Sequence, residues 1–203
     1  VASFLVSNGQ MKKAYHKRKL IIFAEFLPFG PFNKYVRKYL PGVANFSHGE
    51  STPTFDLGDD KTFITPICYE TLFIDYLRSS LNESKQQVNF FVNMANDAWF
   101  RSSQEVHQHE FMARWSAIIF QKPVVRSLNT GRSSIIRNDG RIIARLPNLK
   151  PGVLDGSFLI DPDKKPTPYQ RFGPYSLILL FFLLLGMQWI FAKGFNRSKR
   201  LKP

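Results

Sequence analysis

The chain has 203 residues, a length that suits one domain with a sizeable core and a short appendage. Its 28 Lys and Arg residues outnumber 15 Asp and Glu residues, and the formal charge of +13 would suit nucleic acid or an anionic lipid surface. No nucleic-acid-binding motif accompanies this charge, so we expect no nucleic-acid partner. The single cysteine, Cys68, excludes an internal disulfide.

Short strands and helices are predicted along the first 170 residues. In chain order they are a hairpin over 2–6 and 11–16 with Asn8-Gly9 as its turn, a short helix over 34–40, a strand over 62–68, a helix over 72–81, a strand over 88–92, a helix after Ser102, a strand from Val124, and a hairpin over 133–137 and 141–146. Residues 42–60, rich in Gly, Ser, Thr, Pro and Asp, are expected to form a long irregular loop. Strands and helices alternate in the middle of the chain and hairpins flank them, which predicts α/β layers around a mixed sheet.

The helix after Ser102 carries two local signals. Ser102 and Glu105 have the spacing of a capping box. Met112, Trp115 and the pair Ile118-Ile119 recur at helical spacing, which places them on one face.

The C-terminal residues carry the signature of a membrane span. Residues 175–192 contain no charge, and these eighteen residues approach the about 20 that a bilayer-spanning helix needs. Residues 193–203 hold five Lys and Arg and no acid, so the positive-inside rule predicts a cytoplasmic C-terminus and a preceding domain on the outer side. The expected organisation is therefore a domain over 1–170, a transmembrane helix over 175–192 and a basic cytoplasmic tail over 193–203. A hydrophobic C-terminal core helix is the alternative.

Cys68 stands at the end of the predicted strand over 62–68 and is followed by Tyr69-Glu70. A strand that delivers a thiol to its end, next to a carboxylate, can present a nucleophile from a rigid scaffold. The alternative is a lone cysteine that acts as a small buried hydrophobe. The surrounding residues favour the nucleophile.

Four motifs occur in one order along the chain. They are Tyr15-His16-Lys17 through Glu25, then Ile67-Cys68-Tyr69-Glu70, then Asn96-Asp97-Ala98-Trp99-Phe100 with Gln108-His109-x-x-Met112-Ala113-Arg114, and last Arg126 through Gly131. Together they resemble the nitrilase-like carbon–nitrogen hydrolase superfamily and, within it, the apolipoprotein N-acyltransferases of bacterial inner membranes. The resemblance implies a nitrilase-like α-β-β-α sandwich over 1–170, partial because its N-terminal strands are missing, followed by the terminal span.

The resemblance also implies the roles of individual residues. The catalytic positions are Cys68, Lys17, Glu25 and Glu70, and the substrate-binding positions are Tyr69 and Trp99. Cys68 would accept an acyl chain as a thioester, and Lys17 and the backbone N–H of Tyr69 would stabilise the oxyanion. Lys19 competes with Lys17, because the two share a face if the stretch is extended, but the motif favours Lys17. No metal ion or cofactor is implied.

The function implied by the resemblance is transfer of an acyl chain from a phospholipid, through the cysteine thioester, to the N-terminal amine of a diacylated lipoprotein. The location implied is the bacterial inner membrane, with the catalytic domain on the periplasmic side. Two alternatives stay open: a nitrilase-like amidase in which water is the acceptor, and a non-catalytic, membrane-anchored binding fragment. The family's general base, a Glu in a W-P-E motif, has no counterpart in residues 1–14, so the chain resembles the C-terminal part of a full-length member and is expected to be inactive alone.

Overall fold

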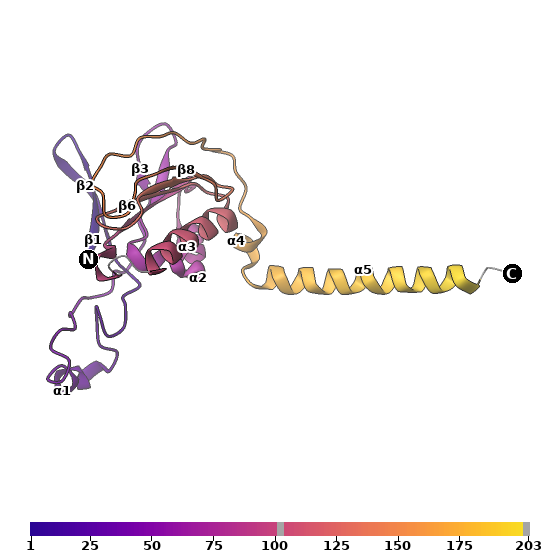
Figure 1. The fold of residues 1–203 in the computed structure, drawn as a ribbon, viewed down its shortest axis with the longest axis horizontal. Helices are drawn as coiled ribbons and strands as arrows, with labels where there is room; N and C mark the ends of the chain where they lie inside the picture. Colours follow the sequence, from indigo (N-terminus) through magenta and orange to yellow (C-terminus); the bar gives the residue numbers. More distant parts are fainter. Residues whose placement is uncertain (101–103, 201–203) are drawn as a thin grey trace. The chain divides into compact units, whose positions relative to one another are not determined.

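The computed structural model describes residues 1–100 and 104–200, with side chains through Ala98 and again from Gln104 to Trp189. The described chain divides into two compact units, Val1–Lys165 and Pro166–Pro203, each of which has its own elements (Figure 1).

A six-stranded mixed sheet forms the centre of the first unit. Its order is β3-β4-β5-β6-β7-β8, and β4, β5 and β6 are parallel while the other neighbours are antiparallel. The strands are β3 Phe55–Asp56, β4 Thr62–Ile64, β5 Phe90–Ala95, β6 Val124–Leu128, β7 Ser134–Ile136 and β8 Ile142–Arg145. The predicted α/β class and mixed sheet are therefore confirmed, as is the second hairpin, whose turn has Gly140 at φ +80°.

Two helices, α2 (Ile74–Glu83) and α3 (Gln104–Phe120), lie on one side of this sheet (Figure 1). The rings of Phe91 on β5 and Phe120 on α3 pack edge to face across the boundary, 6.0 Å apart. Small residues such as Ala113 and Ala117 line the buried face of α3, whereas Trp115 is 47% exposed. The apolar face expected for α3 is thus not the one that packs on the sheet. The predicted Ser102 cap lies outside the described residues.

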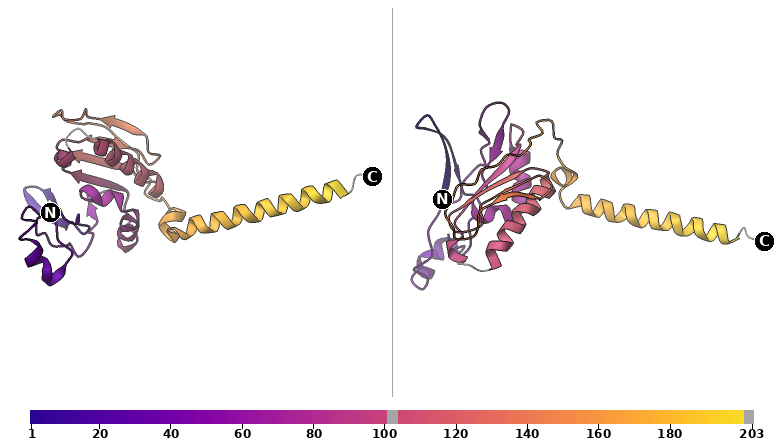
Figure 2. Two further views of the ribbon diagram at one scale, coloured as in Figure 1. Left: turned by 60° about the horizontal axis from the view of Figure 1, so that its bottom comes forward. Right: turned by 45° about the horizontal axis from the view of Figure 1, so that its top comes forward.

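The predicted hairpin is confirmed as β1 (Ala2–Ser7) and β2 (Gln10–His16), and it packs against the opposite side of the sheet together with Phe158 and Ile160 (Figure 2). Its turn residues Asn8 and Gly9 both have positive φ angles, which Asn and Gly tolerate. Tyr15 of β2 packs in one buried cluster with Phe63 and Phe90 of the sheet. Of the sandwich implied by the resemblance, the described residues provide one helical layer, the six-stranded sheet and this two-stranded hairpin.

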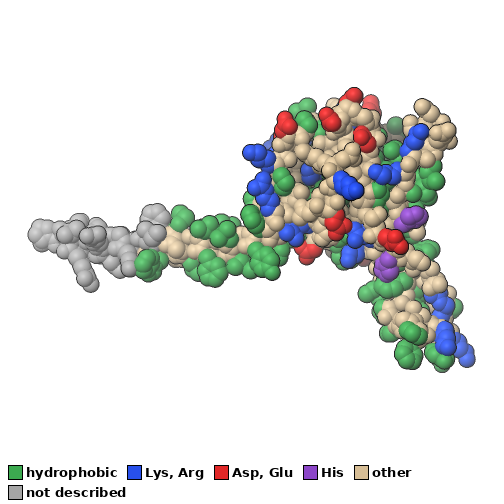
Figure 3. Space-filling model, turned by 180° about the vertical axis from the view of Figure 1, so that it is seen from behind, with side chains coloured by type: hydrophobic (Ala, Val, Ile, Leu, Met, Phe, Trp, Pro, Cys, Tyr) green, Lys and Arg blue, Asp and Glu red, His purple; other side chains and the backbone are tan. Residues whose placement is uncertain are grey.

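Residues 20–47 form a long loop that extends away from the sheet (Figures 1 and 2). We call it the projecting loop. It contains a 3-10 turn, η1 (Gly30–Phe32), and the short helix α1 (Asn33–Val36), which replaces the longer helix expected over 34–40. Hydrophobic and basic side chains gather at its tip (Figure 3), where Phe32 and Tyr39 are 67% and 80% exposed.

The second unit consists of α4 (Pro168–Phe172) and α5 (Tyr175–Arg200). The Thr167 hydroxyl caps α4 by accepting a hydrogen bond from the N–H of Gln170 at 3.2 Å. Among the residues that the structure describes, no helix combines the length and the apolar character needed to cross a membrane.

Candidate functional site

Cys68 lies where the parallel strands end. It does not belong to a strand, as the sequence predicted, but is the first residue of a 3-10 helix, η2 (Cys68–Leu72), four residues after β4. Ile67 forms a parallel bridge with Met94 near the end of β5, so Cys68 stands beside the carboxyl end of the neighbouring strand. Ligands of open α/β sheets bind at this edge.

The backbone of Cys68 adopts a left-handed conformation with φ +53°. For a residue with a side chain this conformation is disfavoured by about 1–2 kcal/mol, and such outliers cluster at functional sites. Two hydrogen bonds to the Cys68 carbonyl hold the turn, from the Thr71 hydroxyl at 3.2 Å and from the Asn93 amide at 3.3 Å. The strained turn is therefore fixed by its surroundings.

The charges around the Cys68 sulfur act in opposite directions. Burial raises the pKa of the thiol, and the carboxylate of Asp97 raises it further. The ammonium group of Lys17 and the backbone N–H groups of Tyr69 and Asn96 lower the same pKa. The balance is a raised thiol pKa, so the free sulfur is held as a thiol, while the groups that would stabilise a negative charge are already next to it.

Lys17 is the cation of this site. Its side chain is only 1% exposed, and its Nζ donates to both oxygens of Glu25, at 2.7 and 2.8 Å. Lys19, by contrast, is exposed, because β2 ends at His16 and the backbone turns there. The structure thus places Lys17 where its charge acts on the Cys68 sulfur and its ammonium group is bound by Glu25.

Glu70 is completely buried, and its carboxylate is bound by backbone N–H groups and a tyrosine hydroxyl. One carboxylate oxygen accepts hydrogen bonds from the backbone N–H groups of Arg18 and Lys19, at 2.8 and 2.9 Å, and the other accepts from the N–H of Ile67 at 2.7 Å. The Tyr15 hydroxyl donates to the same carboxylate. Burial raises the pKa of Glu70, against these hydrogen bonds, which lower it. Glu70 therefore ties the segment after Lys17 to the segment before Cys68.

Further buried polar residues lie near Cys68 that the sequence did not single out as site residues. Asp97 is 0% exposed, and its Oδ1 lies 3.2 Å from Nδ1 of His109. Arg126 is 2% exposed, and its Nε donates at 3.3 Å to the Asn93 side chain, which also donates to the Pro66 carbonyl. The signal for finding them was their position, since Asp97 follows β5, the strand next to β4, and Arg126 lies on β6 and pairs with Asn93 of β5.

Tyr69 is half-buried, and its ring lies edge to face against His109 and Phe73. Its backbone N–H acts on the Cys68 sulfur, and its role in substrate binding stays a prediction. The side chain of Trp99 lies outside the described residues, so its predicted role stays a prediction. Among described side chains, no group of three or more His, Cys, Asp or Glu residues is arranged to hold a metal ion.

Comparison with known families agrees with this geometry. Residues 2–160 match the sequence profile of the carbon-nitrogen hydrolases. The chain belongs to this family. The matched residues include the left-handed Cys68, the buried Lys17–Glu25 pair and the strands that carry them.

Curated relatives carry a more specific name. The chain is 32% identical to the apolipoprotein N-acyltransferase of Vibrio cholerae over 87% of its own length and 34% of that protein. It is 33% identical to the apolipoprotein N-acyltransferase of Methylococcus capsulatus, over 90% of this chain and 35% of that protein. The chain therefore spans about a third of the length of these relatives.

Solved structures of an amidase from Nesterenkonia sp. share the fold. One has a TM-score of 0.54 at 15% identity and covers 85% of this chain and 57% of the amidase. A second, a mutant with the acetamide moiety of fluoroacetamide added covalently at its active-site cysteine, has a TM-score of 0.55 at 15% identity over 75% of this chain and 52% of that one. At this identity the likeness shows the nitrilase-like α/β fold alone.

Proposed function

We propose that this chain supplies the nucleophile and the oxyanion site of an N-acyltransferase that moves an acyl chain from a phospholipid to the N-terminal amine of a diacylated lipoprotein. The observation that carries the proposal is the left-handed Cys68 at the carboxyl edge of the sheet, with the buried Lys17–Glu25 pair acting on its sulfur. The names of the curated relatives support the choice of acyl donor and acceptor.

The reaction has two acyl transfers. In the first, the Cys68 sulfur attacks the ester carbonyl of the phospholipid, a C–S bond forms, the C–O bond breaks, and the thiol proton goes to the departing lysophospholipid oxygen. In the second, the amine attacks the thioester, a C–N bond forms, the C–S bond breaks, and a proton from the amine returns to the sulfur. In both tetrahedral intermediates the oxyanion would lie near Lys17 and the N–H of Tyr69.

Each site residue has a distinct place in this scheme. Glu25 neutralises and orients the Lys17 ammonium group, to which it is bound through both oxygens. Glu70 holds residues 18–19 against Ile67 and so fixes the position of Lys17 relative to Cys68. Tyr69 and Trp99 are the residues proposed to bind the acyl chain.

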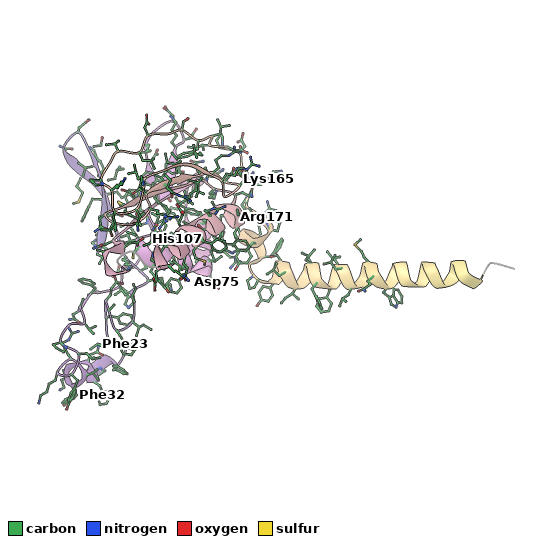
Figure 4. The ribbon with its side chains drawn as sticks, viewed as in Figure 1. Phe23, Phe32, Asp75, His107, Lys165 and Arg171 are labelled. Atoms are coloured by element: carbon green, nitrogen blue, oxygen red, sulfur yellow. The ribbon has the colours of Figure 1, made fainter. Side chains whose placement is uncertain are left out.

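Two exposed surfaces, one on each unit, support the proposal of a lipid substrate. On the projecting loop, Phe32, Tyr35 and Tyr39 are exposed together with basic residues, a combination that favours a membrane interface (Figures 3 and 4). On α5, the large apolar side chains described from Tyr175 to Trp189 are all exposed, at 45–73%. The proposal therefore includes anchoring through residues 175–192 in the bacterial inner membrane, with the domain of 1–170 on the periplasmic side and the tail of 193–203 in the cytoplasm.

The proposal is tested by trapping the thioester. The protein, as its gene encodes it, is incubated in detergent with a phospholipid whose acyl chain is labelled, first without and then with a diacylated lipopeptide. We expect a hydroxylamine-labile label on Cys68 that the lipopeptide removes as N-acylated product. Cys68→Ala should abolish both the adduct and the product, and Ser84→Ala, the loss of a hydroxyl remote from the site, should change neither.

Two outcomes would contradict the proposal. Release of the label as free fatty acid, with the lipopeptide left unmodified, would identify water as the acceptor and favour a hydrolase. Normal product formation by Cys68→Ala would exclude Cys68 as the nucleophile.

A further inference from the structure

A cavity of about 740 Å³ lies at the opposite end of the parallel strands from Cys68. Its wall includes Asn89, which precedes β5, and Lys122 and Pro123, which precede β6. Cys68 and Asn96, by contrast, follow the carboxyl ends of β4 and β5. The cavity is therefore separate from the site proposed above.

The cavity contains a buried cation. Lys122 is 6% exposed, and its ammonium group donates one hydrogen bond, to the backbone carbonyl of Val88. An ammonium group has three donors, and among described side chains no carboxylate lies within ion-pair distance of this one. Buried charges are ordinarily paired, so Lys122 lacks the partner that its burial calls for.

A second cation adds to the excess of positive charge in the cavity wall. Lys164 also lines the cavity, and its charge, together with the larger effect of burial, lowers the pKa of Lys122 to about 8. Arg137 adds a third positive group, although its guanidinium is bound to Asp139 at 3.1 Å. The one carboxylate in the wall belongs to Asp161, whose Oδ1 accepts a hydrogen bond from the backbone N–H of Asp163 at 3.1 Å. The wall thus carries more positive than negative charge.

The rest of the wall combines uncharged polar residues, such as Gln121 and Asn138, with apolar ones. The apolar residues include Pro123 just before β6, Ile143 of β8, and Phe158 and Ile160 from the segment that crosses the sheet. Phe158 is anchored by an edge-to-face contact with Phe90, 5.4 Å between ring centroids, so this side of the cavity is fixed to the core. A wall that combines cations with apolar side chains matches a ligand with an anionic group and an apolar body.

We propose that this cavity binds a small organic anion, with Lys122 and Lys164 holding its phosphate or carboxylate group and with Phe158 and Ile143 contacting its apolar body. The anion supplies the negative charge that the described wall lacks, and its oxygens accept the remaining hydrogen bonds of the Lys122 ammonium group. The inference does not depend on acyl transfer, because none of these residues touches Cys68.

Calorimetric titration of the protein in detergent with phenyl phosphate tests the proposal, with phenol and inorganic phosphate as the two halves of the probe. We expect phenyl phosphate to bind more tightly than either half. Lys122→Met removes the charge but keeps the apolar chain, and it should weaken binding about tenfold or more, since a hydrogen bond to a charged group contributes that much. Lys164→Gln should weaken binding severalfold. Lys165→Gln, which removes an exposed charge outside the wall (Figure 4), should leave it unchanged.

A second measurement needs no variant and so does not depend on the folding of Lys122→Met. The rate at which acetic anhydride modifies Lys122 is followed by peptide mass spectrometry, with Lys165 as the internal reference. Saturating phenyl phosphate should slow modification of Lys122 and leave that of Lys165 unaltered. Unchanged modification of Lys122, equal binding of phenol and phenyl phosphate, or full affinity in a folded Lys122→Met protein would overturn the proposal.

Discussion

Replacing Glu25 by Gln tests whether the Lys17–Glu25 pair is as strongly coupled as its geometry indicates. The Lys17 side chain is 1% exposed and that of Glu25 is 16% exposed, and both carboxylate oxygens lie within 2.8 Å of Nζ. Removing one partner of a buried pair leaves an uncompensated charge and costs about 3–5 kcal/mol. Because Glu25 is partly exposed and Gln keeps one oxygen acceptor, we expect a loss of about 3 kcal/mol, at the lower end of that range.

The free energy of unfolding is measured by urea titration with intrinsic fluorescence and linear extrapolation. Asp59→Asn is the matched control, because it breaks the ion pair with Lys61 at 3.2 Å, whose side chains are 87% and 52% exposed. An exposed pair contributes about 0–1 kcal/mol, and Asn tolerates the left-handed backbone of residue 59 (φ +51°).

The double variant Lys17→Met/Glu25→Gln removes both charges. We expect it to lose less stability than the sum of the two single variants, with a coupling energy of about 0.5–3 kcal/mol. The reasoning is wrong if Glu25→Gln is no more destabilising than Asp59→Asn, or if the losses of the two single variants simply add.

Three further outcomes are expected. Lys17→Ala should reduce acyl transfer by about 10²-fold or more, as for a lost oxyanion donor, whereas exposed Lys19→Ala should have little effect; equal losses would show that the motif is misregistered. Asp97→Asn should lower the pKa of the Cys68 thiol, because it removes a charge that raises it, so the pH profile of iodoacetamide alkylation should move to lower pH; a shift upward would contradict this. Gly131→Ala would drive a Cβ into Oδ2 of Asp97, so we expect a loss of about 1–3 kcal/mol in the free energy of unfolding, measured by the same urea titration.

The sequence predicted the tight turns correctly, because the turn residues themselves determine the backbone angles there. The two hairpins followed from Asn8-Gly9 and Asn138-Asp139-Gly140, because these residues accept the backbone angles that tight turns require. The orientation of α3 could not be predicted in this way. Its buried face is made of residues such as Ala113 and Ala117, which let the helix approach the sheet, while Trp115 stacks on Phe111 outside. Which face packs depends on the sheet, and apolar periodicity alone does not contain that information.

The candidate site, too, could be predicted from the sequence only in part. The motifs brought Cys68, Lys17 and Glu25 to attention, and the structure brings these three together. Asp97 and Arg126 escaped notice as neighbours of the sulfur, because their proximity to it depends on the order of β4, β5 and β6 in the sheet, which the sequence does not give. The left-handed backbone of Cys68 was also unpredictable, since few residues other than glycine adopt it and only the surrounding hydrogen bonds maintain it.

Glu25 of the first motif and Glu70 of the second have separate roles in this arrangement. Glu25 lies against the Lys17 ammonium group and controls its charge and direction, whereas the Glu70 carboxylate accepts backbone hydrogen bonds from both segments that converge on the site. A change at Glu25 therefore acts on the electrostatics of the oxyanion site with the backbone in place. A change at Glu70 leaves three backbone N–H groups without their acceptor and releases the segment after Lys17 from the strained turn at Cys68, so it alters the distance between nucleophile and cation. Acidic residues at both positions are thus explained without either one acting as a base.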